Sequence, residues 1–292
     1  MRILFMTRFK RKALRNKIVL ACKSYGHDVE IISPADVAFV CDGRKNPVTL
    51  KGMPFPKADI IFPYWKRKDS YMWDVLTCLE KDGAVVVNGP ASIAPDKRMI
   101  ALTFAQNDIP QPKTWSVNTN QALISALEDI KPPYIFKEAH SSRGNKVFKV
   151  NTKERAFTIA QVLIDDARDF VIQEMLYPAG KDVRAFVVGN KVVAAMERTA
   201  MEGEFRANIC QGATAVSTIL TPEENAMVIK VSKLFGCLIS GVDFMRTEQG
   251  SICLEINKKP GLQGIEAASG MNIAPLIVKE LEKMLKHKTK VA

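Results

Sequence analysis

The sequence predicts an α/β domain followed by an α+β region, because two patterns divide the chain near residue 88. Up to that point short apolar runs alternate with segments of helical spacing, which is typical of a parallel sheet with connecting helices. Beyond it two hairpins are mixed with helices, which is typical of antiparallel sheet. The length of 292 residues agrees with about two domains.

The leading region is expected to alternate between strands and a helix. Its apolar runs are bounded by turn residues, and one segment repeats apolar side chains at helical spacing. We expect strands at 2–6, 28–32, 58–62 and 85–87 and a helix at 10–23. The turn sequence Asn88-Gly89-Pro90 interrupts this pattern and marks a domain boundary.

The remaining chain is expected to combine hairpins, further strands and helices. Strands are expected at 134–139, 147–150 and 171–175, and helices at 96–107, 121–130, 153–167, 222–235 and 275–285. The two hairpins join 183–188 to 192–196 and 241–245 to 251–256. Each turns at a dipeptide that contains glycine, Gly189-Asn190 and Gln249-Gly250.

The composition is close to that of an average soluble globular protein, with 47% apolar and 25% charged residues. No apolar run approaches the ~20 residues of a membrane helix, and the apolar start at 1–6 is too short for a secretory signal. Six cysteines without a CxxC pair do not indicate a disulfide framework or a zinc site. We therefore expect a cytoplasmic protein with reduced thiols and no membrane partner.

The formal net charge of +11 favours contact with polyanions or acidic substrates. The basic residues are scattered, apart from clusters at 8–12 and 283–290. Charge clusters of this kind are commonly solvated faces, so the sequence does not favour nucleic acid as the partner.

Polar side chains on the last hairpin form a candidate metal site. Glu255 and Asn257 share one face of the return strand because residues two apart point the same way. Counting back around the turn places Asp243 near Glu255. Two carboxylates and an amide oxygen are ligands of the kind that Mg²⁺ takes alongside waters and phosphates. The alternative is a solvent-facing polar edge.

A second candidate feature is Lys137, which ends an apolar strand and can reach a phosphate. The small polar loop at 141–146 follows it and can lay backbone N–H groups over phosphates. The loop is neither a P-loop nor a GxGxxG sequence. Taken alone, it could equally be an ordinary hairpin turn.

The order and spacing of these motifs resemble the ATP-grasp superfamily, and within it the RimK-like ligases, which add glutamate through an amide bond. The resemblance extends from about residue 84 to the end of the chain and is strongest from Asp182 to Ala268. It is carried by Asp182-Val183-Arg184, Glu197-Arg198, Glu202-Gly203-Glu204-Phe205-Arg206-Ala207-Asn208, Glu255-Ile256-Asn257 and Pro260-Gly261-Leu262-Gln263-Gly264.

This resemblance implies an ATP-grasp fold, in which a leading βα domain at 1–88 precedes two α+β subdomains, at 89–180 and 181–292, that clamp ATP. By similarity, Glu174 and Met175 would lie at the adenine edge, and Asp182 would reach the ribose. The expected phosphate contacts are Lys97, Lys137, Ser142, Gly144, Arg206 and Asn208. Asp243, Glu255 and Asn257 would hold Mg²⁺, with Mn²⁺ as an alternative.

The implied reaction joins a carboxylate to an amine. The carboxylate attacks the γ-phosphate of ATP, and an amine then displaces phosphate from the acyl phosphate to leave an amide. Arg206 and Arg184 are the expected stabilisers of the tetrahedral oxyanion. Two alternatives stay open: Lys97 as an ordinary surface lysine, and Arg184 as the partner of a structural carboxylate.

Two departures from the family pattern concern the substrates. Ser141 and Lys146 stand where relatives have glycine, and non-glycine residues tolerate a positive φ poorly. Lys258 and Lys259 follow Asn257, where small residues are usual, and they would suit an acidic acceptor.

Three functions are compatible with the sequence. The first is a ligase that adds L-glutamate to a peptide, a protein C-terminus or a small acid. The second is a ligase of the same superfamily for other amino acids or dipeptides. The third is a nucleotide-binding or polyanion-binding protein without turnover. Relatives of this kind also form homo-oligomers, although no segment of the sequence indicates an interface.

Overall fold

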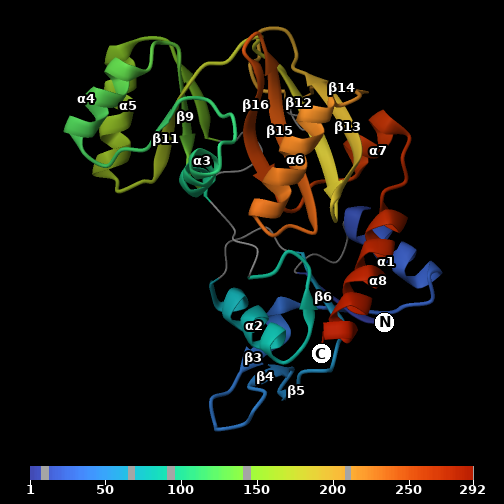
Figure 1. Cartoon of the computed structure of the whole chain (residues 1–292). Helices are drawn as coiled ribbons and strands as arrows, with labels where there is room; N and C mark the ends of the chain where they lie inside the picture. The colour runs from blue at the N-terminus through green and yellow to red at the C-terminus, as the bar shows by residue number, and fades with distance from the viewer. Residues whose placement is uncertain (8–12, 65–69, 91–95, 141–145, 208–211, 292) are drawn as a thin grey trace.

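Helices cover both faces of the parallel sheet that forms the leading domain (Figure 1). The computed structural model describes residues 1–7, 13–64, 70–90, 96–140, 146–207 and 212–291. Alternate side chains of the central strand β1 pack against α1 on one face and α2 on the other, so four of its five residues are buried. The sheet order is β2 (Asp28–Ile32), β1 (Arg2–Met6), β6 (Ile60–Pro63) and β7 (Val85–Val86), and the helices are α1 (Ala13–Ser24) and α2 (Ser70–Lys81).

Two parts of the leading domain were not expected from the sequence. The first is α2, although Met72, Val75, Leu76 and Leu79 follow helical spacing and are buried. The second is a small antiparallel sheet beneath the main one in Figure 1, whose strands are too short to show alternation. It consists of β3 (Val37–Phe39), β4 (Val48–Leu50) and β5 (Met53–Pro54), and a 3₁₀ turn at Pro34–Asp36 precedes it.

The central subdomain is a four-stranded antiparallel sheet with two helices on one face. The helices α4 and α5 each begin at a threonine whose hydroxyl accepts a backbone N–H bond, and their apolar sides pack on the sheet. The sheet order is β10 (Val147–Val150), β9 (Tyr134–Glu138), β11 (Phe170–Glu174) and β8 (Thr114–Trp115), with α3 (Lys97–Gln106), α4 (Asn120–Asp129) and α5 (Lys153–Asp165).

The C-terminal subdomain is a five-stranded antiparallel sheet that contains both expected hairpins. The helix α6 packs on this sheet through Val228 and Val231, and it begins with a capping box between Thr221 and Glu224. The sheet order is β14 (Thr214–Ser217), β13 (Lys191–Thr199), β12 (Lys181–Val188), β15 (Ile239–Thr247) and β16 (Gly250–Asn257), with α6 (Pro222–Leu234) and α7 (Gln263–Ser269).

The last helix, α8 (Ala274–Val291), returns to the leading domain and lies against α1 (Figure 1). One hydrophobic cluster contains Ile3 and Ile18 of the leading domain together with Ile277 and Leu281 of α8. His27 Nε2 also lies 3.0 Å from a carboxylate oxygen of Glu282 in this helix. The two ends of the chain therefore share one core. No helix among the described residues is long and apolar enough to cross a membrane.

The expected boundary residue Asn88 joins the leading domain to the C-terminal subdomain. It is buried and has a left-handed φ of 48°, which asparagine tolerates better than most residues. Its side-chain N–H groups donate to the carbonyls of Ile239 (2.6 Å) and Lys258 (2.7 Å). Its Oδ1 accepts from the backbone N–H groups of Leu238 and Ile239. One amide thus fixes the relative position of three segments.

Candidate active site

A cleft between the central and C-terminal subdomains gathers most of the residues predicted for the site. It contains about 910 Å³ of empty space, its open mouth included, which is within the range of clefts that hold small molecules. Eight predicted site residues line it: Lys97, Lys137, Glu174, Met175, Asp182, Arg206, Asp243 and Glu255. Arg184 and Asn257 are not part of the lining, and Ser142, Gly144 and Asn208 lie outside the described residues.

The apolar side of the cleft suits a flat aromatic base. Ile135, Val147, Met175 and Leu176 line it on the side of the central sheet. Glu174, expected at the adenine edge, accepts a bond from the backbone N–H of Lys113 (2.7 Å).

Gln173 is a cleft residue that sequence reasoning missed. It is buried, its amide nitrogen donates to Thr114, and its Oε1 has no hydrogen-bond partner among the described residues. A buried acceptor of this kind is costly unless a ligand or water satisfies it. The signal available in the sequence was its position directly before Glu174, at the end of a buried strand.

Two lysines enter the cleft from the central subdomain. Burial lowers the pKa of Lys137 to about 8, although Glu255 across the cleft works against this shift. Burial also lowers the pKa of Lys97, again against Glu255. The Nζ of Lys97 donates to the carbonyl of Glu138 (3.2 Å). Both ammonium groups therefore face Glu255 in a largely dry environment, which favours an anionic ligand between them.

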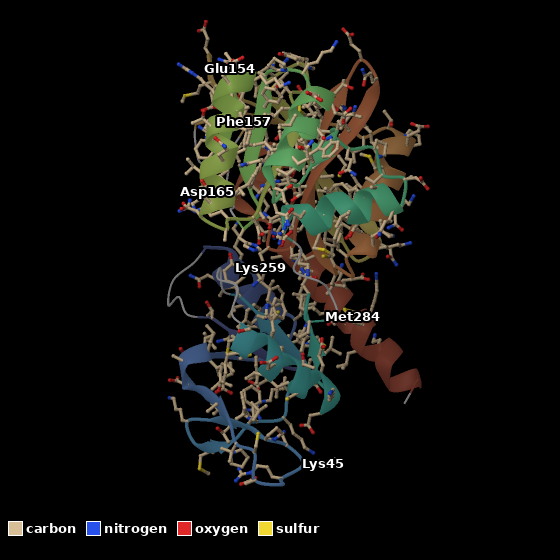
Figure 2. The ribbon with its side chains drawn as sticks, turned by 90° about the vertical axis from the view of Figure 1, so that its left-hand side faces the viewer. Lys45, Glu154, Phe157, Asp165, Lys259 and Met284 are labelled. Carbon is tan, nitrogen blue, oxygen red and sulfur yellow. The ribbon has the colours of Figure 1, made fainter. Side chains whose placement is uncertain are left out.

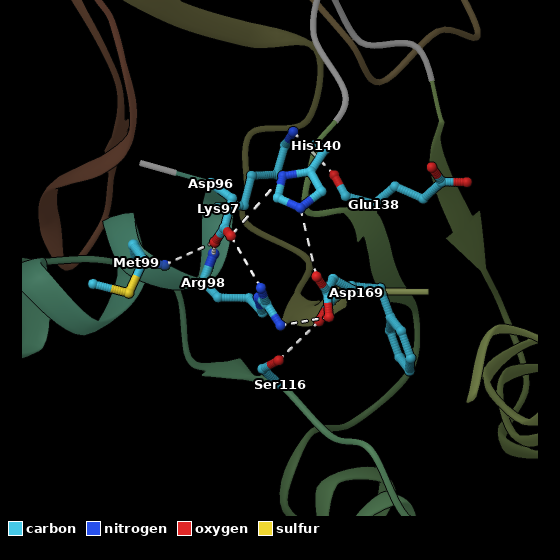
Figure 3. A network of polar contacts seen from close by, with 9 residues as sticks. Asp96, Lys97, Arg98, Met99, Ser116, Glu138, His140 and Asp169 are labelled. Carbon is cyan, nitrogen blue, oxygen red and sulfur yellow. Dashed lines mark hydrogen bonds and ion pairs between the residues drawn. The ribbon is translucent and has the colours of Figure 1, made fainter. Parts of the chain in front are cut away.

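A polar network holds the start of α3, and with it Lys97, against the central sheet (Figure 3). Asp96 caps the helix by accepting from the backbone N–H groups of Arg98 and Met99. The Arg98 guanidinium joins Asp96 (3.0 Å) to Asp169 (2.5 Å). His140 lies between the same two carboxylates, 3.9 Å from Asp96 and 3.5 Å from Asp169. The network thus connects Lys97 to the residue directly before 141–145.

The hairpin of β15 and β16 places Asp243 opposite Glu255, as the sequence predicted. A β-bulge follows, because Phe244 pairs with Cys253 and leaves Leu254 unpaired. As a result Leu254 lines the cleft beside Glu255, although strict alternation along β16 would turn these neighbouring residues to opposite faces. Beyond the hairpin, Asn257 Oδ1 accepts from the backbone N–H of Lys259 (2.9 Å).

Asp243 belongs to a chain of four charges, of which Asp243 and Arg198 are buried and Arg184 and Asp182 are partly buried. Arg184 binds both of its oxygens, at 2.7 and 2.5 Å, and Arg198 binds one of them at 3.0 Å. Arg198 also forms a two-point pair with Asp182, at 2.6 and 2.7 Å. Burial alone would raise the pKa of Asp243, but the two arginines hold it below its usual value. The alternative role given for Arg184, pairing with a carboxylate, is therefore found in the structure, and the carboxylate is that of Asp243.

Arg198 is the second residue that sequence reasoning missed as a member of the site. Its side chain is 2% exposed and is the largest fully buried side chain among the described residues. A buried arginine needs compensating carboxylates, and the register of β12 and β13 places Asp182 directly opposite it. The sequence signal was the polar pair Glu197-Arg198 at the end of an apolar strand.

Arg206 occupies a more open position. It pairs with Glu204 two residues earlier (2.8 Å), and the guanidinium lies 5.5 Å from the centre of the Phe205 ring. Both partners are 27% exposed. The hydrogen bond from Arg206 lowers the pKa of Glu204 to about 2. The Arg206 guanidinium thus lies at the rim of the cleft, partly exposed to solvent.

The donor set on the hairpin fits a magnesium ion. Among the described residues no three His, Cys, Asp or Glu side chains form a metal-binding cluster. The predicted set instead combines two carboxylates with the amide of Asn257. The Asp243 carboxylate accepts three bonds of about four that it can take, and the Asn257 oxygen accepts one of two. Asp243 and Asn257 therefore each keep a lone pair for a metal ion, and Glu255 supplies the second carboxylate. Such a set of oxygens suits Mg²⁺ that also keeps several waters.

This cleft, with lysines on one wall and a carboxylate hairpin on the other, between two α+β subdomains, is that of an ATP-grasp ligase. A family model described as RimK-like ATP-grasp domain matches residues 94–281. The chain belongs to the RimK-like ATP-grasp family, and the expected fold and enzyme class, an ATP-dependent ligase, are confirmed.

Relatives of similar length support this assignment. A protein of Thioalkalivibrio sulfidiphilus named "Probable alpha-L-glutamate ligase" is 30% identical, over 99% of this chain and 98% of its own. The "Probable alpha-L-glutamate ligase 2" of Shewanella amazonensis is also 30% identical, over 98% and 96%.

Solved structures show the same fold at lower identity. The ATP-grasp ligase PsnB, in complex with a phosphomimetic variant of its minimal precursor, Mg and ADP, has a TM-score of 0.76 at 16% identity, covering 97% of this chain and 98% of its own. A RimK domain ATP-grasp protein of Sphaerobacter thermophilus has a TM-score of 0.70 at 16% identity, covering 97% and 100%.

Proposed function

We propose that this ligase uses Mg-ATP to add L-glutamate, through an acyl phosphate, to a peptide, a protein C-terminus or a small acid. The observation that carries the proposal is the cleft in which Lys97 and Lys137 face Glu255 of the β15–β16 hairpin. The choice of glutamate rests on the names of the relatives, and the choice of a peptide acceptor on the precursor bound to PsnB.

The reaction needs positive charge around the transferring phosphoryl group, because both the attacking carboxylate and ATP are anionic. Lys97 and Lys137 supply two such charges from one wall. Arg206 lies at the rim of the cleft, and its guanidinium is the best placed to stabilise the negative charge of the oxyanion that forms when the amine attacks. Arg184 acts through Asp243, whose orientation it fixes.

Glu255, Asn257 and the remaining lone pair of Asp243 would hold Mg²⁺, or Mn²⁺ in its place. When bound, the ion supplies charge neutralisation of the phosphate oxygens. Arg184 and Arg198 keep the Asp243 carboxylate ionised, so it can serve as a ligand at neutral pH.

The proposal is tested by phosphate release from Mg-ATP with L-glutamate and glutamate-ended peptides, with product mass read from the same samples. Wild-type protein should release phosphate only with both substrates, and the peptide should gain whole glutamyl units. Glu255→Gln should lower the rate by about 10²–10³. The matched control is Glu248→Gln, an exposed residue at the turn of the same hairpin, which should keep the rate.

Phosphate release without a mass gain would exclude the proposed transfer of glutamate. A Glu255→Gln protein with the wild-type rate would exclude the proposed metal hairpin.

A further inference from the structure

The helix α3 contacts two subdomains. It precedes the central sheet in the chain, but Ile100 and Phe104 pack into the hydrophobic core of the C-terminal subdomain. The centre of the Phe104 ring lies 6.1 Å from that of Phe235, at the end of α6. Beyond the helix, the carbonyl of Pro110 accepts from the backbone N–H of Cys253 in β16 (2.7 Å). The body of α3 is therefore fixed to the C-terminal subdomain.

The first turn of α3 bonds instead to the central sheet. The backbone N–H of Lys97 donates to the carbonyl of Ala139, just beyond the end of β9 (3.2 Å). The Nζ of the same lysine donates to the carbonyl of Glu138, the last residue of β9 (3.2 Å). One residue of α3 thus makes two bonds across the junction between the subdomains.

Arg98 adds a side-chain bridge between α3 and the central subdomain (Figure 3). Its guanidinium joins Asp96, the N-cap of α3 (3.0 Å), to Asp169, directly before β11 (2.5 Å). Asp169 follows α5, and the Asp165 end of this helix points towards the waist of the molecule, where Lys259 is labelled (Figure 2). The bridge therefore lies at the base of the central subdomain.

The exposure of this bridge indicates a role in orientation more than in stability. The side chains of Arg98 and Asp169 are 34% and 40% exposed, and ion pairs at such positions contribute little to the free energy of unfolding. A planar guanidinium nevertheless holds two carboxylates in one geometry, which the flexible ammonium group of a lysine does not.

The bridge restrains the distance across the cleft. Lys137 lies in β9 of the central sheet, whereas Glu255 lies in β16, which belongs to the sheet that α3 packs on. A displacement of a reacting group by about 1 Å can cost about 10²-fold in rate. We propose that Arg98 is a positioning residue of the reaction, and that its bond to Asp169 holds the two cleft lysines at their distance from Glu255. This inference rests on the proposed ligase function and adds to it a residue that does not itself line the cleft.

The experiment compares Arg98→Met, Asp169→Asn and the double variant with the wild-type protein. Calorimetry with Mg²⁺ and a non-hydrolysable ATP analogue measures the Kd, and phosphate release measures kcat. Each single variant should lower kcat by about tenfold or more and raise the Kd severalfold, while the melting temperature stays that of the wild type. The double variant should lose no more than either single variant, because both substitutions break the same bridge.

A third readout needs neither nucleotide nor turnover. The backbone N–H of Lys97 bonds across the same junction, so its hydrogen exchange in the free protein should be faster in Arg98→Met than in the wild type. The matched control is Asp129→Asn, which breaks an ion pair with Lys113 inside the central subdomain, at a carboxylate that is 39% exposed. This control should leave the Kd, kcat and the exchange of Lys97 unchanged.

A wild-type Kd and kcat in Arg98→Met would overturn the inference, and so would losses that add in the double variant. Asp169→Asn leaves Arg98 paired with Asp96, so a lower melting temperature of this variant would show that the bridge is structural. Faster exchange of Lys97 and weaker analogue binding in a protein that makes no product would contradict the ligase reaction and keep the positioning role. Product formation with wild-type kinetics in both single variants would do the reverse.

Discussion

Two kinds of cation lie in or next to the cleft, and they are stabilised differently. Arg184 and Arg198, on the C-terminal sheet, are bound to Asp182 and Asp243 by bonds of 2.5–3.0 Å, and their pKa values are raised. On the central subdomain, burial instead lowers the pKa of Lys137 to about 8 and also lowers that of Lys97.

This difference predicts that the two arginines contribute mainly to stability and the two lysines mainly to binding. Breaking a buried ion pair leaves an uncompensated charge, so the arginines are expected to matter for stability. A lysine whose pKa is lowered by burial costs stability, and such lysines are typical of binding and catalytic sites. The four predictions below test this contrast, beginning with the largest effect.

Arg198→Met should lower the free energy of unfolding by about 3–5 kcal/mol, because Asp182 loses its two-point partner inside the protein. Denaturant unfolding measures this change. Arg2→Met is the control, since its partners Asp28 and Glu30 are exposed, and it should stay within about 1 kcal/mol of wild type. If both variants changed the free energy of unfolding equally, Arg198 would not have the special role in stability that the comparison assigns to it.

Lys137→Met should lower the ligase rate by about 10²–10³. Its free energy of unfolding should stay the same or rise slightly, because the substitution removes a buried charge. Rate and denaturant midpoint are measured on the same preparation. Lys149→Met, on the exposed side of the neighbouring strand β10, should behave as wild type. A destabilised Lys137→Met protein would show that this lysine is structural.

Arg206→Gln should change the free energy of unfolding by less than about 1 kcal/mol, because its pair with Glu204 is partly exposed. We expect the rate to fall by about tenfold or more if the guanidinium stabilises the oxyanion. An unchanged rate would show that Arg206 takes no part in the reaction.

The affinity for ATP should fall severalfold between about pH 7 and about pH 9, because the Lys137 ammonium loses its proton near its pKa of about 8. Stability should change in the opposite direction. The folded protein binds fewer protons than the unfolded chain from about pH 8 to about pH 10, so the unfolding free energy rises with pH there. Lys137→Met should remove the step in affinity and reduce the rise in stability, as calorimetry and denaturation at several pH values can show.

Most of the fold could be predicted from the sequence because its strands and helices are long and strongly patterned. The last hairpin was expected, but its turn lies at Glu248-Gln249, one residue earlier than predicted. The register set by this turn would pair Asp243 with Leu254, and the bulge is what brings Asp243 opposite Glu255. Strands of two or three residues, such as β4 and β5, carry no such pattern, since three residues cannot distinguish alternation from chance.

The sequence predicted which residues would lie together more fully than how they pair. The family resemblance assigned Arg184 and Asp243 to one site, and only the register of β12 and β15 shows them opposite each other. The bulge that turns Leu254 towards the cleft and the orphaned oxygen of Gln173 depend on three-dimensional packing, which a single sequence does not encode locally. The roles of Ser142, Gly144 and Asn208 stay predictions.

The packing of α8 on α1 also has a consequence for protein synthesis. Ile3 and Ile18 leave the ribosome long before Ile277 and Leu281, which complete their cluster. At ~5–20 residues per second, more than ten seconds separate the two events. During that interval the nascent leading domain exposes the apolar surface that α8 later covers.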